Sequence, residues 1–168
     1  ADDLIPPEAQ HRLMALAHDK DSSAWAMARL IQEIANAYRT DGEWLVPAGQ
    51  LFSAIAIYSN CAASTARTYW DTGRRITPDI QSRFDTIPFH GHKAILAESH
   101  GNAAKHAALC MAWLETADDF GGRVGSLDAL RRWLKSNDGT ELWRGRLERA
   151  VRSVRSLANT QGVPQKLR

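Results

Sequence analysis

The stretch of sequence that decides the fold covers residues 51–70 and reads LFSAIAIYSNCAASTARTYW. Apolar residues recur at helical spacing on both sides of Asn60, which predicts two helices joined by a short turn. Helices that cross steeply need a small residue at the crossing, and Ala56 supplies it. The turn needs a residue that tolerates a left-handed backbone, and asparagine is second only to glycine in this respect. The residues expected to seal the corner are Ile55, Cys61, Ala66 and Tyr69.

Residues 52–71 resemble the helix-turn-helix of DNA-binding regulators from phages and mobile elements. Three positions depart from the family pattern: Asn60 replaces a glycine, Ala66 replaces a small β-branched residue, and Ser59 stands where an apolar residue is usual. In size and motif position the chain is similar to the immunity repressors of actinobacterial (mycobacteriophage-type) phages. The alternative interpretation is an ordinary tight corner inside a helical bundle.

The resemblance implies that the second helix of the motif is the recognition helix. Arg67 is the candidate for reading a base, because a guanidinium group matches the O6/N7 edge of guanine with two hydrogen bonds. Ser64 and Thr68 can reach phosphates or bases, and Trp70 is expected in the core. The outward positions are Ala62, Ala63, Ser64, Arg67, Thr68 and Asp71, with Arg74 and Arg75 expected past the helix end as contacts to the DNA backbone.

Charge is distributed unevenly along the chain. Residues 1–120 hold 10 Lys/Arg and 15 Asp/Glu, whereas residues 121–168 hold 11 Lys/Arg and 4 Asp/Glu. A basic C-terminal part on an acidic body favours a polyanionic partner, because cations that neutralise phosphates release condensed counterions. A solvated helical tail without a partner would show the same composition.

A second candidate corner lies in this basic part. A glycine-rich turn, GGRVG at residues 121–125, is followed by a helix in which Leu127, Leu130 and Leu134 share one face. The free N–H groups at a helix start favour anions, so a second contact with DNA is possible here, and a simple helical hairpin is the alternative. The residues assigned to this contact are Arg123, Ser126, Arg131, Arg132 and Lys135.

The periodicity is helical nearly everywhere, so the expected fold is all-α, with no strands and two small helical units. Residues 1–86 would form the unit that holds the helix-turn-helix, and residues 87–168 the basic unit. We expect one helix to reach Tyr38 and another to cover Lys93–Glu98. The last helix is expected from Thr140 to about Asn159, with arginines around an apolar stripe.

The sequence contains no pattern that supports catalysis, metal binding or membrane insertion. The chain has no Gly-x-Ser-x-Gly, no glycine-rich phosphate loop and no His-Glu-x-x-His, so we expect no enzyme and no cofactor. Histidines 90, 92, 100 and 106 and Cys110 are spread over an expected loop and two helices, so no metal site is expected, although His106 and Cys110 have a zinc-compatible i,i+4 spacing. Two cysteines and no apolar run of membrane length indicate a reduced, intracellular location, and the resemblance to phage regulators implies the cytoplasm of a bacterial host.

The sequence therefore predicts sequence-specific binding to double-stranded DNA, as a transcriptional repressor of phage or mobile-element type. Within DNA binding, a plasmid or phage partition or replication protein is the alternative. From a different class, the alternative is a helical adaptor or anti-repressor. Two oligomeric states stay open: a monomer with two DNA contacts, or a homodimer whose C-terminal unit joins the chains.

Overall fold

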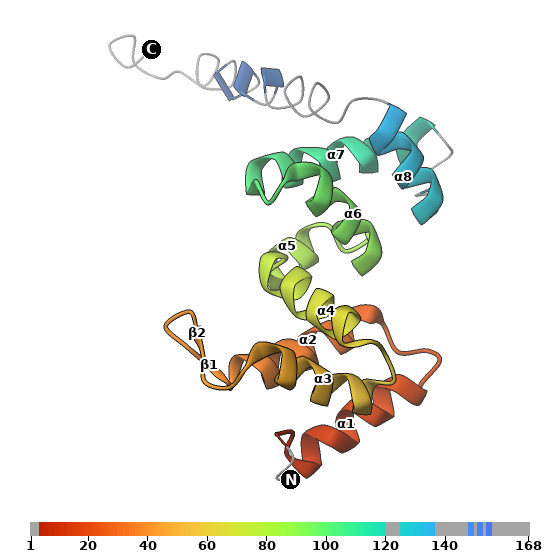
Figure 1. Cartoon of the computed structure of the whole chain (residues 1–168). Coiled ribbons are helices and arrows are strands. Elements are labelled where there is room, and N and C mark those ends of the chain that lie inside the picture. The colour runs from red at the N-terminus through yellow and green to blue at the C-terminus, as the bar shows by residue number, and fades with distance from the viewer. Residues whose placement is uncertain (1–3, 120–124, 137–147, 150, 153, 156–168) are drawn as a thin grey trace. The chain divides into compact units, whose positions relative to one another are not determined.

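The computed structural model describes residues 4–119 and 125–136, together with 148–149, 151–152 and 154–155. These residues are mainly α-helical (Figure 1). The chain divides into two compact units, Ala1–Phe89 and His90–Arg168. This division lies three residues beyond the 86/87 boundary expected from the sequence. None of the helices in the described ranges combines the length and the apolar character needed to cross a membrane.

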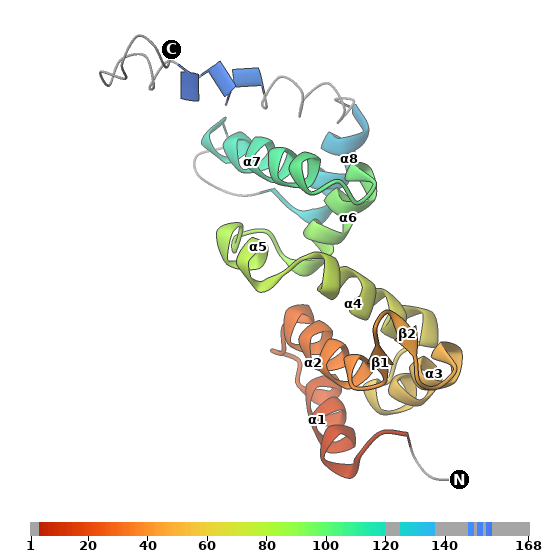
Figure 2. The ribbon, with the colours of Figure 1, turned by 90° about the vertical axis from the view of Figure 1, so that its left-hand side faces the viewer.

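The first unit is built on five helices, α1 (Pro7–His18), α2 (Ala24–Asn36), α3 (Ala48–Ser59), α4 (Ala63–Arg75) and α5 (Pro78–Arg83). Helix α4 packs against both α2 and α3, and α1 packs against α3 (Figures 1 and 2). Ser23 begins α2, because its Oγ accepts a hydrogen bond from the N–H of Ala26 at 3.1 Å. The core includes Leu13, Ile31, Leu51, Phe52, Ile55 and Trp70.

A short β-hairpin between α2 and α3 contradicts the expectation of a chain without strands. Strand β1 (Arg39–Thr40) pairs antiparallel with β2 (Glu43–Trp44). Asp41 and Gly42 connect them with φ values of 51° and 82°, the two positive values that a type I′ turn requires. Helix α2 therefore ends at Asn36 rather than at Tyr38, because the chain enters the hairpin. The Asp-Gly dipeptide after this helix is compatible with a helix stop and is also a strong hairpin signal.

An aromatic cluster ties this hairpin to α4. The ring of Trp70 lies 5.0 Å from that of Trp44 and 5.8 Å from that of Phe52, measured between centroids. The indole N–H of Trp70 donates to Asn36 Oδ1 at 3.1 Å, which satisfies the one polar group of this side chain. Trp70 is buried, so its predicted place in the core is confirmed. Arg39 covers the cluster, with its guanidinium 5.1 Å from the Trp70 ring.

The second unit holds α6 (Phe89–Ser99), α7 (Ala103–Asp119) and α8 (Leu127–Ser136). Helix α6 begins four residues earlier than Lys93, directly after Pro88, so His90 and His92 are helical rather than in a loop. His100 and Gly101, with φ values of 50° and 77°, turn the chain from α6 into α7. The buried side chains of this unit include Ile95, Leu109, Trp113, Leu130 and Leu134.

The expected last helix is described only in part. Glu148, Arg149, Val151, Arg152, Val154 and Arg155 are helical and exposed. The remainder of the expected span from Thr140 to Asn159 lies outside the described residues.

Candidate nucleic-acid interface

The corner between α3 and α4 is closed by a left-handed residue. Asn60 has φ 52° and ψ 46°, as the sequence predicted, and its N–H donates to the carbonyl of Ala56. The N–H of Cys61 also donates to Ala56, at 3.3 Å, so the end of α3 is satisfied by the turn itself. Ala56 and Ala66 are both buried in the core of this unit. Small side chains at these positions let the two helices pack closely.

The unusual serine of the corner has an internal partner. Ser59 is buried, and its Oγ donates to the carbonyl of Ile55 at 2.8 Å. The same oxygen lies 3.2 Å from the sulfur of Cys61. A hydroxyl that bonds back to its own helix costs little in the core, which explains why a polar residue fits here.

The N-terminal half of α4 presents a polar face to solvent. Ala62 precedes the helix and provides no side-chain cap, so the first-turn N–H groups receive no hydrogen bond acceptor from it. Ser64 and Thr65 are exposed, whereas Thr68 is half-buried and its hydroxyl donates to the Ser64 carbonyl at 2.9 Å. Ala63, also expected outside, is half-buried. Thr65 is a further exposed residue of this face, which the sequence did not assign to it.

Arg67 lies on this face one turn further along. Its side chain is exposed, and the guanidinium carbon is 5.7 Å from the ring centroid of Phe52. Within the part of the chain that the structure describes, no carboxylate forms an ion pair with Arg67. The aromatic contact orients the side chain and leaves its hydrogen bond donors directed to solvent or to a partner.

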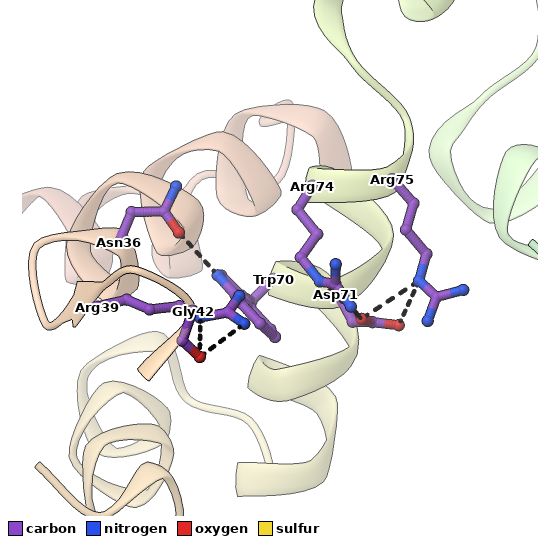
Figure 3. Close-up of polar contacts among 7 residues, drawn as sticks. All are labelled: Asn36, Arg39, Gly42, Trp70, Asp71, Arg74 and Arg75. Carbon is purple, nitrogen blue, oxygen red and sulfur yellow. Dashed lines mark hydrogen bonds and ion pairs between the residues drawn. The ribbon is translucent and has the colours of Figure 1, made fainter. Parts of the chain in front are cut away.

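The C-terminal end of α4 carries a compact charge cluster (Figure 3). Arg74 Nη2 lies 2.8 Å and Arg75 Nε 3.3 Å from the carboxylate of Asp71. Both arginines occupy the last turn of α4, not the segment past its end, so that expectation is wrong. Cations suit this position because the last carbonyls of a helix carry partial negative charge. Asp71 offsets part of their charge, which makes them weaker candidates for phosphate contacts than Arg67.

Arg29 of α2 fixes the end of α4 in place. Its Nη1 donates to the carbonyl of Gly73 and its Nη2 to that of Ile76, each at 2.6 Å. Nη2 also donates to Gln81 Oε1 at 2.8 Å. Burial lowers the pKa of Arg29 from its usual value. Through Arg29, helix α2 binds the C-terminal carbonyls of α4, and α5 binds the same guanidinium through Gln81. The two neighbouring helices α2 and α5 therefore determine which face of α4 is exposed.

The second corner is only partly described. Arg123 lies outside the described residues. Ser126 begins α8, and its Oγ accepts a hydrogen bond from the N–H of Ala129 at 3.2 Å. The serine thus occupies the anion-binding position that was assigned to this helix start.

Helix α8 separates its apolar and basic faces. Leu130 and Leu134 are buried and Leu127 is half-buried, as the spacing indicated. The basic side chains are exposed, and Arg131 Nη1 lies 3.8 Å from Asp128 Oδ1. Both members of that pair are mostly exposed, so the pair contributes little to stability. An open depression on this face is lined by Asp128, Arg131, Arg132 and Lys135.

Comparison with family models, with curated proteins and with solved structures finds no match to this chain. The candidate interface therefore depends on the residues and their geometry alone.

Proposed function

We propose that this chain binds double-stranded DNA sequence-specifically, with α3 and α4 as a helix-turn-helix and α4 as its recognition helix. One observation carries the proposal: a three-residue turn with left-handed Asn60 leads into a helix start without a side-chain cap, and the following exposed face holds Arg67. This is the arrangement that lets the N-terminal residues of a second helix reach base edges in the major groove.

The side chains of α4 divide into two roles. Arg67 reads a guanine, because its five donors include the two parallel N–H groups that the O6/N7 edge accepts. Ser64 and Thr65 hydrogen-bond to phosphates or bases, and the uncapped helix start attracts a phosphate. Arg74 and Arg75 contribute to the positive field around the helix end while they remain paired with Asp71.

The second unit supplies a further contact with the DNA backbone. The exposed side chains of Arg131, Arg132 and Lys135 on α8 belong to the part of the chain in which Lys/Arg outnumber Asp/Glu by 11 to 4. Contacts of this kind increase affinity for any sequence and make it depend on salt. The biological role that we assign, a transcriptional repressor of phage or mobile-element type in the cytoplasm, follows from the resemblance described above.

Selection of duplexes from a random library by the full-length protein tests the proposal. We expect enrichment of one short motif, protection of that motif in a footprint, and a log-linear loss of affinity with salt. The matched pair of variants is Arg67→Ala and Arg12→Ala, since Arg12 is an exposed arginine of α1 that pairs with Glu33. Only the first should weaken binding to the motif.

Three outcomes would overturn this function. Enrichment without any common motif would indicate a non-specific binder. Little binding to DNA even at low salt would favour the helical adaptor. Equal effects of the two arginine variants would show that α4 is not part of the interface, even if the protein binds DNA.

A further inference from the structure

Three buried side chains of the second unit converge although they are separated in sequence. His92 lies on α6, and His106 and Cys110 lie one turn apart on α7. Their exposed fractions are 0%, 2% and 0%. His92 Nδ1 is 3.1 Å from His106 Nε2 and 3.9 Å from Cys110 Sγ. One ligand atom from each of the three residues lies within 4.8 Å of the other two.

This convergence corrects the expectation that the histidines are spread apart. Helix α6 begins at Phe89, which makes His92 helical, and the turn at His100 and Gly101 reverses the chain. His92 thereby meets the i,i+4 pair of α7. The sequence showed the pair but not its third member, because the start of α6 was placed at Lys93.

The spacing of the three donor atoms agrees with a tetrahedral metal centre. Zinc binds histidine nitrogen at about 2.0–2.1 Å and cysteine sulfur at about 2.3 Å, so its ligand atoms lie roughly 3.3–3.7 Å from one another. The separations of 3.1 Å and 3.9 Å fall on either side of that range. The third pair, His106 and Cys110, lies within 4.8 Å, so these two side chains on α7 would have to approach each other when an ion binds.

The ring of His106 directs Nε2 toward His92 Nδ1. In the described part of the chain, Nδ1 of His106 is buried and has no hydrogen bond partner. A neutral imidazole that carries its proton on Nδ1 offers the Nε2 lone pair to a metal, as zinc coordination requires.

We propose that His92, His106 and Cys110 form a zinc site that joins α6 to α7. Two imidazole nitrogens and a thiolate are ligands that zinc prefers, and a water molecule would complete the tetrahedron. The thiol of Cys110 loses its proton when the ion binds, so one proton is released to solvent for each ion bound at this residue. The site stabilises the second unit and is independent of whether α4 reads DNA.

Cobalt substitution of the full-length protein tests the site directly. The protein is stripped with a chelator under reducing conditions, titrated with Co²⁺ and followed by absorption spectroscopy, and Zn²⁺ is then added. We expect one Co²⁺ per chain with the d–d bands of tetrahedral coordination and a sulfur-to-cobalt charge-transfer band, and we expect Zn²⁺ to displace it. Zinc should also raise the melting temperature of the stripped protein.

Variants of ligands and of matched non-ligands complete the test. Cys110→Ala should abolish the charge-transfer band, and His92→Gln and His106→Gln should each lower zinc affinity at least about 100-fold. Cys61→Ser and His100→Asn should leave binding unchanged, since Cys61 belongs to the first unit and His100 is exposed.

Far-UV circular dichroism establishes whether each variant is folded. Absence of stoichiometric Co²⁺ binding to the folded wild-type chain would overturn the proposal. So would a charge-transfer band that survives in Cys110→Ala or that disappears in Cys61→Ser. If a ligand variant unfolds, binding by the wild-type chain and its thermal stabilisation by zinc still decide the matter.

Discussion

The starts of α4 and α8 look alike in sequence and differ in structure. Each helix carries basic residues on an exposed face. Ala62 leaves the first turn of α4 without a side-chain cap, whereas Ser126 caps α8 through the N–H of Ala129. Arg67 pairs with no carboxylate in the described ranges, while Arg131 lies 3.8 Å from Asp128.

This difference separates two kinds of proposed contact with DNA. Helix α4 offers first-turn N–H groups that Ala62 does not cap and an oriented guanidinium, both of which form directed hydrogen bonds. Helix α8 satisfies its own start and offers exposed cations, whose attraction for phosphates has little direction. We therefore assign sequence preference to the first unit and salt-dependent affinity to the second.

Among these predictions, removal of the Trp70 side chain should have the largest effect, and this effect is on the stability of the first unit. Trp70→Ala should lower the free energy of unfolding of the first unit by about 3–5 kcal/mol, because it empties the centre of the Trp44–Phe52 cluster. Trp133→Ala is the counterpart in the second unit, where Trp133 is half-buried against Trp113. Urea denaturation followed by far-UV circular dichroism should show the smaller loss for Trp133→Ala. A loss for Trp70→Ala no larger than that for a surface substitution would mean that the first corner does not depend on its aromatic support.

The sequence predicted the corner between α3 and α4 well, because each of its main features has one dominant local cause. The left-handed backbone of Asn60 and the burial of Trp70 follow from turn chemistry and apolar spacing. The hairpin was not predicted because two-residue strands are too short to show an alternation of apolar and polar residues. Only Asp41 and Gly42 indicate it.

Two features could not be read from the chain, one a local competition and the other a contact between residues distant in sequence. The pairing of Arg74 and Arg75 with Asp71 competes with solvent, and spacing alone does not say which wins. The meeting of His92 with His106 and Cys110 depends on how α6 and α7 pack. The fold class was therefore predictable, whereas the charge pairs of the candidate site were predictable only in part.

Charge reversal on α8 should have the next largest effect. Arg131→Glu combined with Arg132→Glu should weaken binding to specific and random duplexes alike, by about two orders of magnitude at 0.1 M salt, because each phosphate contact adds roughly 0.9 to the salt slope. Folding should be unaffected, since both side chains are exposed. The measurement is fluorescence anisotropy across a salt series.

The same double variant distinguishes the two oligomeric models. If it leaves DNA affinity unchanged and abolishes self-association in sedimentation experiments, the second unit joins two chains. The binding site should then be a two-fold palindrome with half-sites about one helical turn apart. In that case the assignment of a DNA contact to α8 is wrong.

Arg67→Ala should act on specificity instead of on general affinity. We expect a loss of about 1–3 kcal/mol on the selected motif, relaxed preference at one or two base pairs, and little change on random duplex. Binding to a panel of single-base variants of the motif measures this. A uniform loss over all sequences would make Arg67 a phosphate contact and remove the contrast with α8.

Substitutions of Asn60 test the turn that aims α4, and their expected effect is the smallest. Asn60→Val should destabilise the first unit by about 1–2 kcal/mol, because a β-branched side chain clashes with the left-handed backbone at φ 52° and ψ 46°. Asn60→Gly should be neutral or stabilise slightly, since glycine adopts this conformation without strain. Thermal unfolding compares the two variants at one position, so differences in exposure cancel.

The pair also tests whether the corner matters for recognition. Asn60→Gly keeps the N–H bond to Ala56 and should therefore retain motif affinity, whereas Asn60→Val should lose affinity in the fraction of molecules whose corner opens. Affinity measured well below the melting temperature of each variant separates misdirection of α4 from unfolding. If Asn60→Val binds and melts like the wild type, the backbone at this position does not set the direction of α4. The difference between the starts of α4 and α8 would then depend only on their capping and on their charge pairs.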